Sequence, residues 1–335
     1  MLYLLLVNVP EQAALADKLC AIAGMENVFF TNSGAESNEC AIKIARLHAH
    51  QRGIANPQII VMERAWHGRT LATLAATGSR KAQAGFEPLV GGFIRVPYND
   101  IEAIRSIAAH QNSVVAVLSE VVQGEGGIVA ARAEYLQALR ELCNQQEWLL
   151  MIDEVQSGIG RTGKWFAHQW TDIVPDVMPL AKGLGSGFPI GACLAHGAAA
   201  QVFKPGNHGT TFGGGPLASV AALRTLEIME EEGLLANAHA MGALLKSELQ
   251  AALAGVAGVK EVRGHGLMLG IELDRACGDI PTMALDIGLL TNVTQDSVVR
   301  VLPPLIVNEA ETREMAARLS RVVKSFLAQP QKAAA

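Results

Sequence analysis

The feature that most constrains the fold is a series of short, uninterrupted apolar runs between Val28 and His196. Runs such as Val114–Leu118 and Leu149–Asp153 lack the polar alternation of a strand with one face in water, and helix-like segments separate them. Strands that are covered on both faces are typical of α/β proteins with a mainly parallel sheet. This fold class is therefore predicted.

The character of the chain changes after Pro216, where a small C-terminal α+β domain is expected to follow a large one. The other strands of the large domain are expected at Val28–Thr31, Gln58–Met62, Phe93–Val96, Val177–Ala181 and Ala192–Ala195. Two helices that lead away from the sheet are expected at Leu217–Glu232 and Ala236–Ala254, followed by strands at Met268–Leu273 and Val298–Leu302 and a closing helix at Asn308–Leu327. The expected boundaries are 1–20 for an N-terminal remnant, 21–235 for the large domain, 236–330 for the small domain and 331–335 for a tail.

Composition narrows the classes of partner. The 335 residues are 50% hydrophobic, with a mean hydropathy of +0.24 and a net charge of −5. No basic block stands out, so neither nucleic acid nor a membrane surface is expected as a partner.

The five cysteines contain no C-x-x-C pair and predict reduced thiols in a cytoplasmic protein. The apolar run Met1–Val7 is too short to span a bilayer, and a secretory signal is the weaker interpretation because no Lys or Arg precedes it.

Two glycine-containing turns are candidates for binding an anion. Ser33–Glu36 lies where a strand ends and a helix begins, and a helix N-terminus offers free N–H groups to an anion such as phosphate. The simpler alternative is that Ser33 only caps the helix. In the second turn, His208–Gly215, the paired hydroxyls of Thr210 and Thr211 are suited to an oxyanion, and the alternative is an ordinary flexible loop.

An acid and a lysine follow two of the expected strands, and together they suggest pyridoxal phosphate (PLP). The amine of Lys182 can form a Schiff base with an aldehyde, and the carboxylate of Asp153 can keep a pyridine nitrogen protonated. Trp66 can stack on a flat ring, Val155 can pack on its other face, and Gln156 can donate to a ring oxygen.

Each of these residues also has a structural explanation, as a capping acid, a solvated lysine or a core tryptophan. The functional interpretation is favoured by position, because Ser33, Trp66, Asp153 and Lys182 all follow expected strand ends, where ligands bind in open α/β sheets. His67 and His208 lack a second ligand at a metal spacing, so no metal site is expected. There is no G-x-S-x-G, and Gly183–Gly187 is not G-x-G-x-x-G.

The chain resembles the class III (ornithine-type) aminotransferases, which are PLP enzymes of fold type I, from about Pro10 to the C-terminus. Seven ordered blocks carry this resemblance: Ser33–Glu39, Trp66–Thr70, Gln123–Gly127, Asp153–Gly158, Ala181–Gly183, His208–Gly214 and Arg263–Met268. The resemblance implies a large domain with a mainly parallel seven-stranded sheet and a small C-terminal domain. Within the class, the blocks most resemble the acetylornithine aminotransferases of arginine biosynthesis.

The resemblance also implies roles for individual residues. Lys182 is the Schiff-base lysine, Asp153 pairs with the pyridine nitrogen, Gln156 contacts the 3-oxygen, and Trp66 and Val155 enclose the ring. The phosphate lies at Ser33, Gly34 and Ala35, with Thr211 contributed by the neighbouring subunit of a homodimer. Arg69 binds the substrate α-carboxylate, and Arg300 binds 2-oxoglutarate but is masked by Glu125 when the amino donor is bound.

The reaction implied by the resemblance is transfer of the amino group of N2-acetyl-L-ornithine to 2-oxoglutarate, and these enzymes often also accept succinyldiaminopimelate. Ornithine, succinylornithine or 4-aminobutyrate aminotransferase activity remains an alternative, as does a truncated paralogue without catalysis. Family members usually carry a longer N-terminal segment, so the chain is expected to bind PLP poorly or to dimerise weakly. Trp66 also replaces the usual Phe or Tyr.

Overall fold

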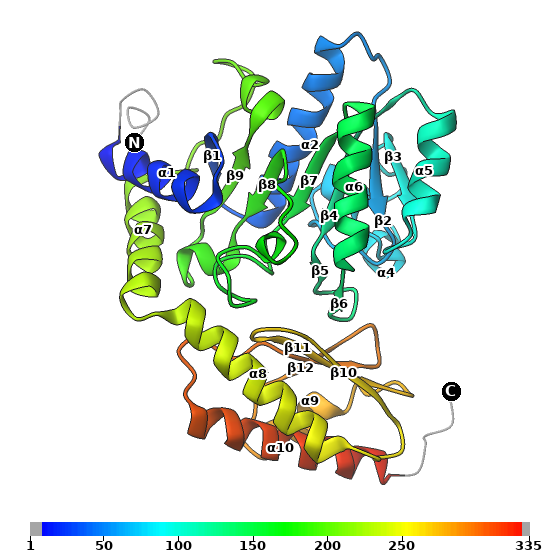
Figure 1. The fold of residues 1–335 in the computed structure, drawn as a ribbon, viewed down its shortest axis with the longest axis vertical. Coiled ribbons are helices and arrows are strands. Elements are labelled where there is room, and N and C mark those ends of the chain that lie inside the picture. The colour runs from blue at the N-terminus through cyan, green and yellow to red at the C-terminus, as the bar shows by residue number, and fades with distance from the viewer. Residues whose placement is uncertain (1–8, 330–335) are drawn as a thin grey trace. The chain divides into compact units, whose positions relative to one another are not determined.

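A computed structural model describes residues 9–329, which form two compact units (Figure 1). The first unit comprises residues 9–121, 131–159 and 165–232. The second unit comprises 233–329 together with two short segments, 122–130 and 160–164. The domain boundaries drawn from the sequence stay a prediction, and both the apolar run of residues 1–7 and the tail 331–335 lie outside the described residues.

The first unit is built on a seven-stranded sheet in the order β1-β9-β8-β7-β4-β2-β3. Its strands are β1 Asn27–Thr31, β2 Gln58–Met62, β3 Phe93–Val96, β4 Val114–Glu120, β7 Leu149–Asp153, β8 Val177–Leu180 and β9 Gly191–Ala195. The pairs from β3 to β8 are parallel, and only β9 runs in the opposite direction, antiparallel to both β8 and β1. The predicted α/β class and mainly parallel seven-stranded sheet are confirmed.

The uninterrupted apolar runs are buried, as their composition predicts. Every residue of β4 and β7 is buried. Small and aliphatic side chains of α2, from Cys40 to Ala49, pack on one face of the sheet. The helices of this unit are α1 Pro10–Ala23, α2 Gly34–Gln51, α3 Leu71–Ala76, α4 Arg80–Gln83, α5 Ile101–His110, α6 Ala133–Gln146 and α7 Pro216–Glu231. The 3₁₀ helices η2 Ala167–Trp170, η3 Lys182–Gly185 and η4 Gly197–Gln201 also belong to this unit.

Helices α1 and α7 lie side by side at the β1 edge of the sheet (Figure 1). Lys18 of α1 forms an ion pair with Glu230 of α7 at 2.5 Å. The stretch 217–232 thus packs in the first unit. No helix in the described range 9–329 is both long and apolar enough to cross a membrane.

The second unit contains a four-stranded antiparallel sheet in the order β10-β11-β13-β12. Its elements are β5 Val122–Gln123, β6 Val129–Ala130, α8 Leu234–Leu253, β10 Val259–His265, β11 Met268–Leu273, α9 Ile280–Leu285, β12 Asn292–Thr294, β13 Val298–Val301 and α10 Glu309–Leu327. Helices α8 and α10 pack against each other, and their apolar faces share one core with β11 and β13. The sequence did not predict β10, because this edge strand lacks an apolar run. It carries the charged residues Lys260, Glu261 and Arg263, and Val262 is its one buried residue.

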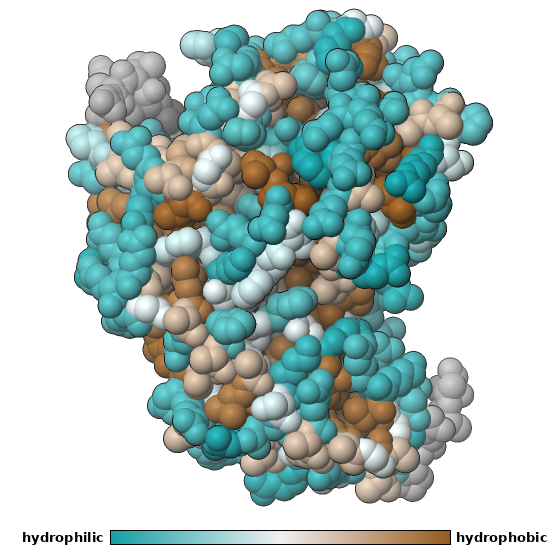
Figure 2. All heavy atoms as spheres, viewed as in Figure 1, coloured by the Kyte–Doolittle hydropathy of each residue, from teal (hydrophilic) through white to brown (hydrophobic). Residues whose placement is uncertain are grey.

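The surface in Figure 2 is mostly hydrophilic, and apolar residues are exposed in separate groups. The large apolar side chains exposed on the first unit are Leu71, Phe86, Trp170, Val174, Phe188, Phe212, Leu217 and Val220. Phe212 and Leu217 are 59% and 69% exposed and lie close together in the chain. This is a large amount of apolar surface to leave in water.

Gly242 provides a test of packing in the second unit. It lies inside α8, where an added Cβ would overlap the backbone of Gly266, and Gly266 in turn packs on the backbone of Thr162. Alanine favours a helix by about 1 kcal/mol over glycine, but the overlapped backbone has no room to move. We therefore expect Gly242→Ala to destabilise the protein by about 2 kcal/mol, measured as a lower midpoint of thermal unfolding.

The matched control is Ser247→Ala, an exposed position in the same helix, which should change the midpoint little. A midpoint for Gly242→Ala at or above that of the wild type would contradict the packing described here.

Candidate active site

A cavity of about 530 Å³ opens in the first unit at the carboxyl ends of β1, β2, β7 and β8. Its volume is in the range of small-molecule sites. Eight of the residues singled out from the sequence line it: Ser33, Gly34, Ala35, Trp66, Arg69, Asp153, Val155 and Lys182. They come from four separate segments, and the parallel direction of their strands brings these segments to one edge of the sheet.

The N-terminus of α2 forms one wall of the cavity. Ser33 caps the helix, since its Oγ accepts a hydrogen bond from the backbone N–H of Glu36 at 3.3 Å, and the carboxylate of Glu36 accepts from the backbone N–H of Asn32 at 2.6 Å. Gly34 packs so closely on Val155 that an added Cβ would lie 2.6 Å from Val155 Cγ1. The first-turn N–H groups of a helix have no partner inside the helix, so this wall is suited to an anion.

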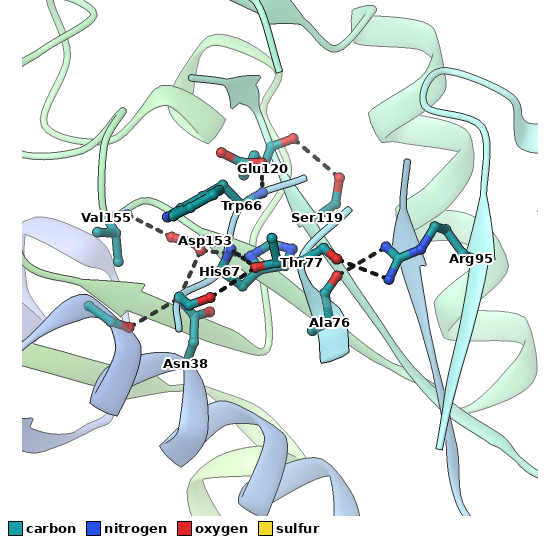
Figure 3. Close-up of polar contacts among 12 residues, drawn as sticks. Asn38, Trp66, His67, Ala76, Thr77, Arg95, Ser119, Glu120, Asp153 and Val155 are labelled. Carbon is teal, nitrogen blue, oxygen red and sulfur yellow. Dashed lines mark hydrogen bonds and ion pairs between the residues drawn. The ribbon is translucent and has the colours of Figure 1, made fainter. Parts of the chain in front are cut away.

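The carboxylate of Asp153 is almost fully buried and is held by three hydrogen bonds (Figure 3). Its Oδ2 accepts from Nδ2 of Asn38 and contacts Nδ1 of His67, each at 2.8 Å. Its Oδ1 accepts from the backbone N–H of Val155 at 2.9 Å. Donors on both oxygens stabilise the negative charge and fix the orientation of the carboxylate at the cavity wall.

Asn38 and His67 are candidate site residues to which the sequence reasoning gave no role at the cofactor. Both line the cavity, and both retain a buried polar atom, Asn38 Oδ1 and His67 Nε2, with no partner among residues 9–329. The signal for Asn38 was available, because it lies four residues after Gly34 and therefore on the same face of α2. His67 was weighed only as a metal ligand, whereas here its ring orients a carboxylate.

Trp66 and Arg69 lie together at the mouth of the cavity. The guanidinium carbon of Arg69 is 5.2 Å from the centroid of the Trp66 ring, a distance that allows a cation–π interaction. The backbone N–H of Trp66 donates to Oε2 of the buried Glu120 at 3.1 Å (Figure 3). The indole is thus anchored through its own backbone, and its ring contributes to the cavity surface.

Lys182 follows the end of β8 by two residues and has a strained backbone. Its φ of +44° lies in the left-handed region, which a residue with a Cβ rarely adopts. It opens the short 3₁₀ helix η3, and its side chain is exposed along the cavity. Backbone strain of this kind concentrates at functional sites, where the surrounding structure holds it in place.

The other residues implied by the family resemblance lie elsewhere. Gln156 is half-buried one residue beyond Val155 and does not line the cavity. Thr211 lines a second cavity of about 340 Å³ in the first unit, together with Phe188, Phe212 and Leu217. Glu125 and Arg300 both belong to the second unit and form an ion pair there.

Comparison with known proteins gives consistent matches over nearly the whole chain. The family model described as aminotransferase class-III matches residues 3–323. Acetylornithine aminotransferase 1 of Bordetella parapertussis is 60% identical over 97% of this chain and 82% of that protein. Among solved structures, the ornithine aminotransferase of Toxoplasma gondii, described with partial occupancy of PLP at its active site, has a TM-score of 0.90 at 32% identity and covers 96% of this chain and 77% of its own. The acetylornithine aminotransferase of Elizabethkingia anophelis has a TM-score of 0.83 at 31% identity, covering 94% and 79%.

The strain at Lys182 leads to a prediction about ligand-free protein. Lys182→Ala and Lys182→Gly both remove the amine, but only glycine relieves the positive φ. We expect Lys182→Gly to be more stable than Lys182→Ala by about 1 kcal/mol, measured by urea denaturation.

The control pair is Lys81→Ala and Lys81→Gly, at an exposed position in helix α4. Here the order should be reversed, with glycine the less stable. If alanine were more stable than glycine at both positions, the backbone at Lys182 would not be strained.

Proposed function

The chain belongs to the class-III aminotransferases, and we propose that it transfers the amino group of N2-acetyl-L-ornithine to 2-oxoglutarate, giving N-acetylglutamate 5-semialdehyde and glutamate. Transfer between an amino acid and a 2-oxo acid is the reaction of the family. The single observation that carries the catalytic part of the proposal is the cavity that Asp153 and Lys182 share. The choice of acetylornithine is supported by the 60% identity to an acetylornithine aminotransferase.

PLP is the cofactor of this family, and the cavity offers partners for its phosphate, its ring faces and its pyridine nitrogen. The N-terminus of α2 at Gly34 and Ala35 is suited to the phosphate, and Trp66 and Val155 provide two apolar surfaces for the ring. The buried polar atoms without partners, Asn38 Oδ1 and His67 Nε2, also fit a polar ligand at this position. When bound, PLP supplies a protonated ring that withdraws electrons from the Cα of an attached amine.

Two residues carry the chemistry in this proposal. The amine of Lys182 would hold the cofactor covalently, and when free it would act as the base for the proton on the substrate Cα. Asp153 balances the positive charge of the ring nitrogen, and the hydrogen bonds from Asn38 and Val155 keep the carboxylate oriented for this task. Gln156 is proposed to contact the ring oxygen.

Substrate selection is assigned to three charged residues. Arg69 is proposed to bind the α-carboxylate through its planar fork. Arg300 is proposed to bind the distal carboxylate of 2-oxoglutarate, while Glu125 masks it when a neutral acylated side chain is bound. The ion pair between Glu125 and Arg300, with Arg300 Nε also donating to Asn292 Oδ1 at 3.1 Å, supports this proposal. A switch of this kind lets one pocket accept both a neutral and an acidic side chain.

We also propose a cytoplasmic homodimer in which Thr211 reaches the phosphate of the neighbouring subunit. The exposed side chains of Phe212 and Leu217, which line the same cavity as Thr211, support an interface there. All five cysteines are free thiols, as expected in a reducing compartment.

A panel of amino donors tests the proposed substrate. With 2-oxoglutarate as acceptor, we expect kcat/KM for N2-acetylornithine to exceed that for ornithine and for 4-aminobutyrate by at least about tenfold. This factor corresponds to a difference of about 1.4 kcal/mol in transition-state stabilisation between the donors. Succinylornithine and succinyldiaminopimelate complete the panel, since each also presents an acylated or acidic side chain.

Lys182→Ala is the matched control, and it should abolish turnover with every donor. A preference for ornithine, the donor named for the Toxoplasma gondii structure, would replace the proposed substrate but not the reaction class. Turnover by Lys182→Ala at the wild-type rate would contradict the proposed mechanism.

A further inference from the structure

Helix α3 directly follows the segment 66–69, which supplies Trp66, His67 and Arg69 to the cavity. The helix has only six residues, Leu71–Ala76. A helix this short is not stable by itself in water. Its position, and with it the position of segment 66–69, therefore depends on contacts at its two ends.

The C-terminal end of α3 is held by Arg95, which lies in β3 (Figure 3). Nη2 of Arg95 donates to the carbonyl oxygens of Ala75 at 2.8 Å and Thr77 at 3.1 Å. Nη1 donates to the carbonyl oxygen of Ala76 at 3.2 Å and to that of Met62, the last residue of β2, at 3.3 Å. The guanidinium thus binds carbonyl groups that have no partner within the helix, and its positive charge matches the negative end of the helix dipole.

The N-terminal end of α3 is held by Glu39, which lies in α2. Its Oε1 accepts from the backbone N–H of Thr73 at 3.3 Å and from the hydroxyl of Thr70, the residue before the helix. A carboxylate at this end matches the positive end of the dipole. We call Glu39 and Arg95 the α3 clamp, because they bind opposite ends of one helix with opposite charges.

The α3 clamp connects to the cavity through Thr77. The carbonyl of Thr77 accepts from Arg95, and its hydroxyl accepts from the backbone N–H of His67 at 3.0 Å and donates to the carbonyl of Gly68 at 3.2 Å. His67 in turn contacts the carboxylate of Asp153 at 2.8 Å. Figure 3 shows this continuous path from Arg95 through Thr77 and His67 to Asp153.

We propose that Glu39 and Arg95 are positioning residues for this enzyme, which fix segment 66–69 so that Trp66, His67 and Arg69 meet the cofactor and substrate. The inference rests on the proposed function of the cavity. Neither residue lines the cavity, so both act through α3 and Thr77. Loss of either charge leaves the chemistry at Lys182 intact but loosens the surface on which the ring lies.

The experiment compares Arg95→Met, Arg95→Lys and Glu39→Gln with the wild type. The measurements are the PLP dissociation constant, followed by the visible absorption of the bound cofactor, and the visible circular dichroism, which reports how the ring is held. We expect Arg95→Met to weaken PLP binding at least tenfold and to reduce the dichroism per bound cofactor. Arg95→Lys, which keeps the charge but loses the fork, should fall between it and the wild type.

Arg140→Met is the matched control for a purely structural effect. Arg140 is another arginine of the first unit whose guanidinium binds protein groups, since it pairs with Asp176 at 2.7 Å and donates to the carbonyl of Val174. It should lower the thermal midpoint of the cofactor-free protein without changing the dichroism. Glu39→Gln removes the opposite charge at constant size, so it tests the clamp even if Arg95→Met does not fold.

The inference would be overturned if Arg95→Met and Glu39→Gln bound PLP with the affinity and dichroism of the wild type, or if Arg140→Met changed both as strongly. A wild-type protein that acquires no visible band with PLP would instead contradict the proposed function itself. The two failures are therefore distinguishable.

Discussion

The carboxylate of Asp153 is the point on which the arrangement of the site depends. It ends a fully buried strand, where an unpaired charge would be strongly unfavourable. The structure compensates with hydrogen bonds from Asn38 of α2, from His67 in the loop after β2 and from the backbone N–H of Val155. Each of these three segments also lines the cavity, so the same contacts that make the buried charge tolerable also fix the walls around it.

Much of the fold could be predicted from the sequence because its signals are local. The apolar runs of β4 and β7 and the cap at Ser33 each place an element within a few residues. The parallel direction of the strands then brings Ser33, Trp66, Asp153 and Lys182 to one edge. Strand β10 and helix α3 were missed, because an exposed edge strand and a six-residue helix carry little periodic signal.

The residues that support the site could not be read in the same way. Arg95 looks like a polar interruption of an apolar strand, and only the tertiary structure shows four carbonyl groups around its guanidinium. His67 was considered only as a metal ligand and set aside, because its partner Asp153 is distant in sequence and their contact is visible only in the structure. Family resemblance implied that Glu125 pairs with Arg300, and the two side chains form an ion pair in the structure.

The central claim is that Asp153 keeps the ring nitrogen of bound PLP protonated. The most direct measurement is the ¹⁵N chemical shift of the pyridine nitrogen of labelled PLP bound to the wild type and to Asp153→Ala at neutral pH. The account predicts a protonated nitrogen in the wild type and an unprotonated one in Asp153→Ala. The same protonation state in both proteins would contradict it.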